Sequence, residues 1–170
     1  MQIDQESRTS RNQTHLFFWG SIYSQWQKAR FSEDGISYNS AEQYMMAMKA
    51  RQFQDAEAFD KIMAAKDPRE QKAIGRTVKG FDSKVWDKVA FDHVVQANRL
   101  KFAQNPQMKA ALLATGDLII VEGSPYDTIW GVGLMWDDPA IEDPANWKGQ
   151  NLLGEALMKV RSELNQEAGS

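Results

Sequence analysis

Residues 38–51 combine the start of a helix with a long run of helix-forming residues, and the rest of the predicted fold is arranged around them. Asn39 or Ser40 can act as the N-cap, and Glu42 or Gln43 supplies the carboxylate or amide that completes a capping box. The remainder of the run consists mostly of good helix formers and contains neither Gly nor Pro. The sequence therefore predicts a helix that begins directly after this cap.

Glu42, Met46 and Lys49 follow i, i+4, i+7 spacing, so they share one face of this helix. Because a helix rises about 1.5 Å per residue, the backbones of Glu42 and Lys49 are roughly 10 Å apart along that face. Both side chains are long enough to reach one small molecule lying across Met46. A structural interpretation is also open, because Glu stabilises first turns, Lys is usually solvated and Met fills cores. A charged pair on the same stripe as an apolar residue favours a functional site.

The composition excludes several classes of protein. The chain has no Cys, which rules out structural disulfides, thiolate metal sites and cysteine nucleophiles. The net charge of −3 argues against a protein that grips duplex DNA along a basic surface, although a local cationic pocket for phosphates stays open. Residues 1–14 contain no signal-peptide core and no apolar run could cross a bilayer, so we expect a soluble, cytoplasmic protein.

The pattern of turns and apolar residues predicts one mostly helical α+β domain with a small β-sheet. The length of 170 residues suits a single domain, with a flexible tail over residues 1–14 and the folded domain over residues 15–166. Asp34 and Gly35 predict a hairpin turn, and Asp67 with Pro68 predicts a capped helix start. We expect strands at 15–19, 118–121 and 128–136, a hairpin across 26–38, helices at 41–51, 54–65, 68–75, 83–104, 106–116 and 151–161, and a loop at 137–149.

No standard cofactor or metal motif is present. The sequence contains no GxGxxG, Walker or HExxH pattern. The acidic residues between positions 137 and 143 are interrupted by Pro and do not match an EF-hand, which favours a solvated acidic loop. His15 and His93 lie far apart in sequence, and neither has a nucleophile signature beside it. We therefore expect neither a metal ion nor a cofactor.

Residues 122–133 form a second candidate segment, in which a strand ends in a Pro turn. The segment then presents Asp127 and Trp130, followed by Gly131. Loops held by rigid elements commonly carry function, and glycines allow the backbone to approach a ligand closely. The alternative, that Asp127 caps a turn and Trp130 belongs to the core, is equally consistent with the sequence.

An ordered series of motifs is more specific than any one of them. The series runs YNSAEQYMMAMK (38–49), DPREQKAIGR (67–76), Trp86, LKFAQNP (100–106), LLATG (112–116), SPYDTIWGVG (124–133), NLLG (151–154) and LMKVR (157–161). From about Phe17 to Leu164 this series resembles the NADAR (YbiA-like) family. The resemblance implies an α+β domain with N-glycosidase activity on ribosyl compounds. It also implies two substrate classes, namely ribose-phosphate intermediates of riboflavin synthesis and ADP-ribose attached to guanine in nucleic acid.

The resemblance also implies roles for individual residues. Glu42 matches the acid/base, Lys49 the active-site lysine of the helix, Asp127 and Trp130 the family's aspartate–tryptophan pair, and Trp86 its aromatic wall. We further expect Tyr44 and Gly131 to contact substrate, and Arg76 and the helix start at Asn151 to hold phosphate. Lys49 could hold a phosphate or hydroxyl as an ammonium, or attack an opened ribose as an amine to form a Schiff base. The resemblance favours the covalent role.

The expected reaction is cleavage of a ribose C1–N bond, which develops oxocarbenium character and requires a carboxylate near C1. We expect an ADP-ribosyl-guanine glycohydrolase, with single-stranded nucleic acid as a possible partner and no membrane partner. An N-glycosidase acting on riboflavin intermediates is the alternative. A non-catalytic module that binds ADP-ribose is the alternative from another class.

Overall fold

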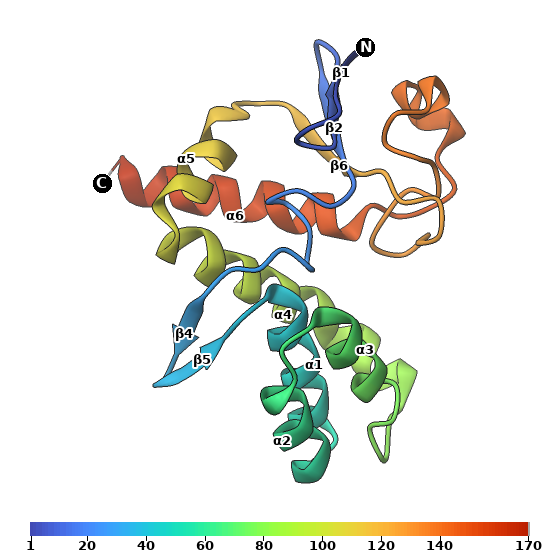
Figure 1. Ribbon diagram of the computed structural model, residues 1–170. Helices are drawn as coiled ribbons and strands as arrows, with labels where there is room; N and C mark the ends of the chain where they lie inside the picture. Colours follow the sequence, from blue (N-terminus) through green and yellow to red (C-terminus); the bar gives the residue numbers. More distant parts are fainter. Residues whose placement is uncertain (170) are drawn as a thin grey trace. The chain divides into compact units, whose positions relative to one another are not determined.

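The computed structural model describes residues 1–169, which form two compact units. Unit 1 comprises Met1–Ser24 and Gln107–Ser170, and unit 2 comprises Gln25–Pro106. The described chain contains six α-helices and a small mixed sheet, so the predicted α+β class is confirmed (Figure 1). The sequence predicted one folded domain over residues 15–166, and this division stays a prediction. Local patterns reveal helices and strands, but the grouping of those elements depends on contacts between distant residues.

Unit 2 is built around α1 (Ala41–Gln52), against which three other helices pack (Figure 1). These are α2 (Ala56–Ala64), α3 (Pro68–Gly75) and α4 (Ser83–Gln104). Because helices surround it, every residue of α1 from Ala41 to Met48 is buried. The Glu42 side chain, in the first turn of this helix, is therefore withdrawn from water.

A hairpin precedes α1, as the sequence predicted. It consists of β4 (Phe31–Glu33) and β5 (Ile36–Tyr38), which pair antiparallel. Asp34 and Gly35 both adopt positive φ, at 52° and 80°, which is the conformation of a type I′ turn. Phe31 and Tyr38 stack at 5.7 Å between ring centroids on the buried side of the hairpin.

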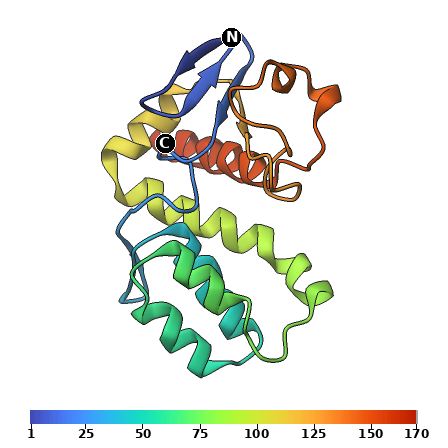
Figure 2. The same cartoon turned by 45° about the vertical axis from the view of Figure 1, so that its right-hand side comes forward.

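Unit 1 contains a four-stranded sheet of order β1–β2–β3–β6. Its strands are β1 (Gln2–Asp4), β2 (Thr9–Arg11), β3 (His15–Phe18) and β6 (Ile119–Glu122). The first three form an antiparallel meander, and β6 pairs parallel to β3 in the register His15↔Ile119 (Figure 2). The last helix, α6 (Leu152–Ala168), packs against β6, and α5 (Pro106–Ala114) begins at the boundary of the unit.

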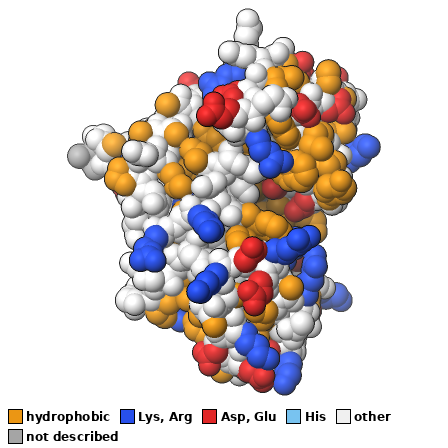
Figure 3. All heavy atoms as spheres, viewed as in Figure 1, with side chains coloured by type: hydrophobic (Ala, Val, Ile, Leu, Met, Phe, Trp, Pro, Cys, Tyr) orange, Lys and Arg blue, Asp and Glu red, His pale blue; other side chains and the backbone are white. Residues whose placement is uncertain are grey.

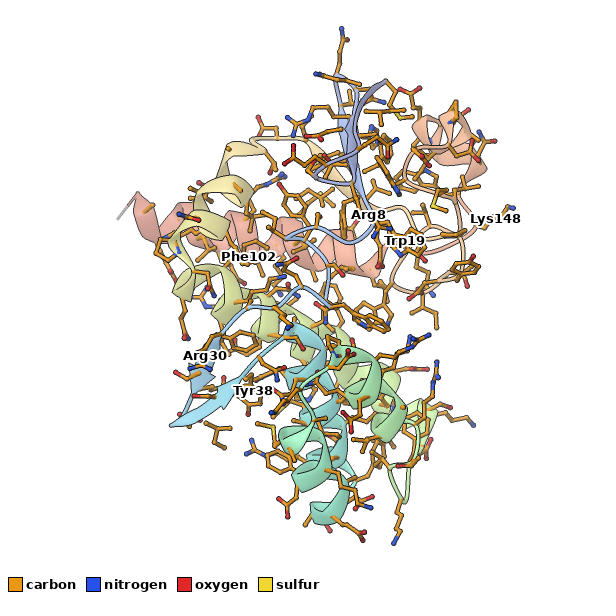
Figure 4. All side chains as sticks on the ribbon, viewed as in Figure 1. Arg8, Trp19, Arg30, Tyr38, Phe102 and Lys148 are labelled. Carbon is orange, nitrogen blue, oxygen red and sulfur yellow. The ribbon has the colours of Figure 1, made fainter. Side chains whose placement is uncertain are left out.

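Residues 1–14, which we expected to form a flexible tail, instead contribute β1 and β2. Thr9 and Ser10 are buried, and the Ser10 hydroxyl donates a hydrogen bond to the Trp136 carbonyl. The Arg8 guanidinium lies 5.2 Å from the centre of the Trp19 ring (Figure 4). The polar composition concealed these strands, because their stability depends on pairing with the apolar strand β3.

Residues 128–136 do not form the strand that we expected. Two backbone hydrogen bonds of Val132 instead hold this segment. Its N–H donates to the Glu122 carbonyl at the end of β6, and its carbonyl accepts from the Lys148 N–H. Gly133 turns the chain with φ +74°. Val132 is completely buried in a cluster with Phe17, Val121, Trp136 and Ile141. The β-branched residue therefore serves the core of unit 1 without entering the sheet.

The expected loop at 137–149 contains two short 3-10 helices, η1 (Pro139–Glu142) and η2 (Pro144–Asn146). Asp138 and Asp143 cap them by accepting hydrogen bonds from Ala140 N–H and Ala145 N–H, each at 2.9 Å. Residues 1–169 contain no group of three or more acidic or His side chains placed to hold a metal ion. Over the same range, no helix has the length and apolar character needed to span a membrane.

Candidate active site on helix α1

The Ser40 side chain caps the start of α1, the helix that carries the candidates Glu42 and Lys49. Ser40 Oγ accepts a hydrogen bond from the Gln43 N–H at 3.0 Å, and Gln43 Oε1 accepts one from the Asn39 N–H at 2.8 Å. This is the predicted capping arrangement, with the amide reaching one residue further back than in the usual capping box. Glu42 is only 6% exposed, and its backbone N–H donates to the Gln25 carbonyl at 3.0 Å. The carboxylate is therefore buried at the first turn of the helix.

Lys49 lies two turns further along the same face and is half-buried. Burial lowers the pKa of Lys49 from its ordinary value of 10.5, because the charged form loses hydration. The Glu42 carboxylate opposes this change, and the positive charge of Arg76 adds to it. The predicted residues Glu42, Lys49 and Arg76 therefore form one electrostatic group within unit 2.

A glycine explains how Arg76 comes close to this group. Arg76 directly follows α3, whose last residue is Gly75. A Cβ atom at Gly75 would lie 2.1 Å from the Met46 sulfur, so the glycine gives the Met46 side chain room between α1 and α3. Met46 is itself 6% exposed and lies between the two charged positions along α1. The Arg76 side chain is exposed at this point, where a phosphate could reach it.

Tyr44 lies on another face of α1, because it is two residues, or about 200°, from Glu42. Its hydroxyl donates to Glu33 Oε1 at 2.9 Å, and its ring lies 5.0 Å from that of Tyr38. Burial and the Glu33 carboxylate raise the pKa of the Tyr44 phenol. These contacts give Tyr44 a structural role in joining the hairpin to α1, and its predicted contact with substrate stays a prediction.

Trp86 is 6% exposed in the first turn of α4. Its ring stacks on His93 at 5.7 Å with an interplanar angle of 17°. Burial lowers the pKa of His93, and the carboxylates of Asp92 and Glu33 oppose that change. The tryptophan thus packs on its own helix, and its role as an aromatic wall stays a prediction.

In unit 1, Asp127 forms the turn that the sequence offered as one of two interpretations. Its Oδ1 accepts hydrogen bonds from the Ile129 N–H at 2.9 Å and from the Trp130 N–H at 2.8 Å. This is an Asx-type turn, in which the carboxylate replaces a backbone carbonyl. The second carboxylate oxygen is not used by this turn, and Trp130 is half-buried.

Asn151 is occupied by contacts to the backbone of β6. Its side chain accepts from the Glu122 N–H at 3.0 Å and donates to the Ile120 carbonyl at 2.9 Å. The N–H groups of Asn151, Leu152 and Leu153 donate to carbonyls of residues 129–131, including that of Gly131. The start of α6 therefore gives these donors to protein carbonyls, which leaves Arg76 as the better supported of the two predicted phosphate contacts.

Phe81 was not singled out in the sequence. Its ring centre lies 4.3 Å from the Lys49 Nζ. The only local signal is an aromatic residue placed after Gly80 in a polar connection, which does not reveal the partner of the ring.

The chain is similar to known proteins in both sequence and fold. A sequence profile of the NADAR domain matches residues 12–165. The N-glycosidase R617 of Acanthamoeba polyphaga mimivirus is 45% identical over 166 residues, covering 89% of this chain and 97% of that protein. The chloroplastic riboflavin biosynthesis protein PYRR of Zea mays is 33% identical over 138 residues, which cover 77% of this chain but 20% of that protein.

The solved structures include a close match to the whole fold. The NMR structure of the E. coli protein YbiA superimposes with a TM-score of 0.76 at 27% sequence identity, over 96% of this chain and 92% of that chain. The profile, the relatives and this structure together confirm the resemblance found in the sequence. The chain therefore belongs to the NADAR domain family.

Proposed function

We propose that this protein is an N-glycosidase that removes ADP-ribose from ADP-ribosylated guanine by cleaving a ribose C1–N bond. One observation carries the proposal: α1 holds a buried Glu42 and a half-buried Lys49 on one face, in a chain 45% identical to an N-glycosidase. Charged groups withdrawn from water in this way are typical of reactive sites, because desolvation changes their protonation and strengthens their interactions.

Each residue has a task in this reaction. The Glu42 carboxylate stabilises positive charge at C1 and helps to activate water. Lys49 as an amine attacks C1 of the opened ribose, the C1–N bond to guanine breaks, and water later hydrolyses the resulting Schiff base. The lowered pKa of Lys49 supports this task, since a neutral amine is more accessible than in a solvated lysine. Exposed Arg76 would bind a phosphate of ADP-ribose.

Guanine in a single strand is the preferred base. Aromatic residues suit a guanine that has left the base stack. Lys and Arg side chains are interspersed with Asp and Glu on the face drawn in Figure 3, which fits a short single strand better than a long duplex. The cytoplasmic location expected from the sequence remains part of this proposal.

An N-glycosidase acting on riboflavin intermediates is the second candidate. The similarity to the PYRR protein of Zea mays favours it, although the matched segment covers 20% of that longer protein. The chemistry at C1 is the same in both cases, so Glu42 and Lys49 keep their tasks. The two candidates differ in the leaving base and in the phosphate that Arg76 would hold.

The test is incubation with a guanine-ADP-ribosylated oligonucleotide and mass spectrometry of both products. Wild-type protein should release ADP-ribose and restore guanine, and Glu42→Gln should slow turnover by roughly 10²–10⁴-fold because it removes an acid/base. Glu57→Gln is the matched control, since Glu57 is also the second residue of a helix but is exposed and paired with Lys61 at 3.0 Å. This control should keep its activity.

The other outcomes identify the alternatives. Turnover of riboflavin intermediates alone would move the assignment to the second candidate. Calorimetric binding of ADP-ribose without turnover of any ribosylated base would indicate a non-catalytic binding module. Failure of borohydride to trap a covalent adduct on Lys49 during turnover would contradict the Schiff-base role and leave Lys49 as a charged contact.

A further inference from the structure

Phe81 lies beside Lys49 although it comes from the connection between α3 and α4. Its ring centre is 4.3 Å from the Lys49 Nζ, a distance at which an ammonium is attracted to an aromatic face. The ring also meets Phe53 edge to face, with centroids 5.5 Å apart and planes at 69°. Phe81 remains 44% exposed, so core packing alone does not account for its position.

The residues before and after Phe81 are anchored, which places its ring over the lysine. The Lys79 N–H donates to Asp55 Oδ2 at 2.9 Å, while Asp55 Oδ1 caps α2 through the Ala58 N–H at 3.0 Å. Gly80 then turns the chain with φ +77°, a conformation that favours glycine. Asp82 follows and caps α4 by accepting from the Lys84 N–H at 2.9 Å. The ring is therefore held between two fixed points of unit 2.

The surroundings of Lys49 explain what the ring contributes. Two charged groups act on the ammonium, Glu42 on its own helix and Arg76 at the end of α3, and their effects on it are opposite. Burial has removed part of its hydration. The face of the Phe81 ring, just before α4, attracts the Lys49 ammonium without a hydrogen-bond acceptor.

We propose that Phe81 is a positioning residue for Lys49, which directs the amine and favours its charged form until substrate takes the place of the ring contact. In its catalytic consequence this inference rests on the function proposed above, but the coupling between Phe81 and Lys49 does not. A substrate that displaces the ring removes one support of the positive charge. The amine is then released for attack at the moment when its target is present.

The first measurement follows the reactivity of Lys49 in the ligand-free protein. The protein is acetylated with acetic anhydride at a series of pH values, and the Lys49 peptide is quantified by mass spectrometry. In Phe81→Leu the midpoint of the profile should fall by about half a pH unit, because the ring no longer favours the ammonium. Below the midpoint, labelling should become about threefold faster. Greater exposure alone would raise the plateau without moving the midpoint.

Two further variants make the result specific. Phe81→Tyr keeps an aromatic face and should keep the wild-type midpoint. Phe59→Leu removes a comparable contact to another cation of α1, since the Arg51 guanidinium lies 4.8 Å from the Phe59 ring. This variant should also leave the Lys49 midpoint unchanged. An unchanged midpoint in Phe81→Leu, or an equal shift in Phe59→Leu, would overturn the proposal.

Activity measurements then test the catalytic consequence. With the ADP-ribosylated oligonucleotide, Phe81→Leu should shift the pH profile of kcat/KM, which reports the ligand-free protein, in the same direction as the labelling profile, and Phe81→Tyr should restore it. A shifted labelling profile in a protein without glycosidase activity would contradict the proposed function and support the coupling. Glycosidase activity with an unshifted profile in Phe81→Leu would contradict the coupling alone.

Discussion

Lys101 and Lys49 both lie in unit 2, and the difference in their surroundings separates a structural lysine from a candidate for reaction. Lys101 is 0% exposed in α4, and burial lowers its pKa from 10.5 to about 7. Its Nζ lies 5.0 Å from the ring centre of the neighbouring Phe102. Lys49 is only half-buried, so part of its side chain remains open to solvent. A perturbed pKa therefore indicates a reactive candidate only where a ligand can reach the group.

The buried Lys101 predicts a specific dependence of stability on pH. Its pKa is about 7 in the folded protein and 10.5 in the unfolded chain, so the unfolded chain binds more protons between these values. The free energy of unfolding should therefore increase with pH across this window, with a contribution of up to about 1 kcal/mol per pH unit from this group. Below pH 7 the lysine is charged in both states, so stability no longer changes with pH through this group and the cost of its buried charge is complete.

Urea denaturation of wild type and Lys101→Met at neutral and alkaline pH measures this contribution. The stability of wild type relative to the variant should increase with pH, because only wild type carries the titrating group. Lys88→Met is the matched control for the loss of a lysine, since Lys88 is exposed on the same helix. Parallel stability curves for wild type and Lys101→Met would contradict the prediction.

At the scale of elements, the start of α1 belongs to a polar network that joins three helices. Ser40 Oγ caps α1 and also donates to Gln71 Oε1 at 3.1 Å. Gln71 Nε2 on α3 donates to Asn39 Oδ1 and to the Ala65 carbonyl after α2, each at 2.9 Å. Gln43 Nε2 adds a bond of 3.1 Å to the carbonyl of Ile62, within α2. The turn that carries Glu42 is thus fixed by the ends of its neighbours.

We expect Ser40→Ala to destabilise the protein by roughly 2–3 kcal/mol. It removes a helix cap, worth about 1 kcal/mol, and leaves the buried Gln71 oxygen without its donor, which costs about 1–3 kcal/mol. Asp67→Ala removes an exposed cap on α3, where the carboxylate accepts from the Arg69 N–H, and should cost only about 1 kcal/mol. Urea denaturation of both variants checks the difference, and equal losses would show that the network adds no stability beyond the cap.

Elements whose signal is local were predictable from the sequence. Residues 83–104 were predicted as a helix from their periodicity and form α4 with the same bounds, and the Asp67 cap before Pro68 begins α3 as expected. The expected strand at 128–136 was wrong, because Val132 faces the core of unit 1 without pairing along a ladder. A β-branched residue near glycines has the same local pattern in both settings.

The same limit applies to the candidate site. Glu42 and Lys49 were predictable as a pair because helical spacing alone puts them on one face. The contact between Phe81 and Lys49 was not, since it depends on how Asp55 anchors a distant turn. Asp127 could be assigned to a turn or to chemistry from its sequence, and only the hydrogen bonds to Ile129 and Trp130 identify the turn.

At the scale of the whole molecule, the chain leaves unit 1 after Ser24 and returns to it at Gln107. Unit 1 is therefore assembled from two segments far apart in sequence, and the parallel pairing of β3 with β6 joins them. β3 is completely shielded along Leu16, Phe17 and Phe18, with β2 on one edge and β6 on the other. The meander at the start of the chain thus protects the strand that holds the two segments together.

This arrangement predicts a stepwise effect of N-terminal truncation. Deleting residues 1–5 removes β1, whose residues are all exposed, and should lower the free energy of unfolding by roughly 1 kcal/mol or less. Deleting residues 1–11 also removes buried Thr9 and Ser10, the hydrogen bond to the Trp136 carbonyl and the partner of β3. We expect this second deletion to cost roughly 3 kcal/mol or more, because β3 would then present an open edge and unpaired backbone groups.

Urea denaturation of the two deletions, together with Ser10→Ala, separates the contributions. Ser10→Ala should cost roughly 1–2 kcal/mol, since it removes one buried hydrogen bond while leaving the ladder intact. The remainder of the loss in the longer deletion then measures the pairing of β2 with β3. If both deletions unfold like wild type, residues 1–14 behave as the flexible tail expected from their polar composition, and the first edge of the sheet in unit 1 is β3 itself.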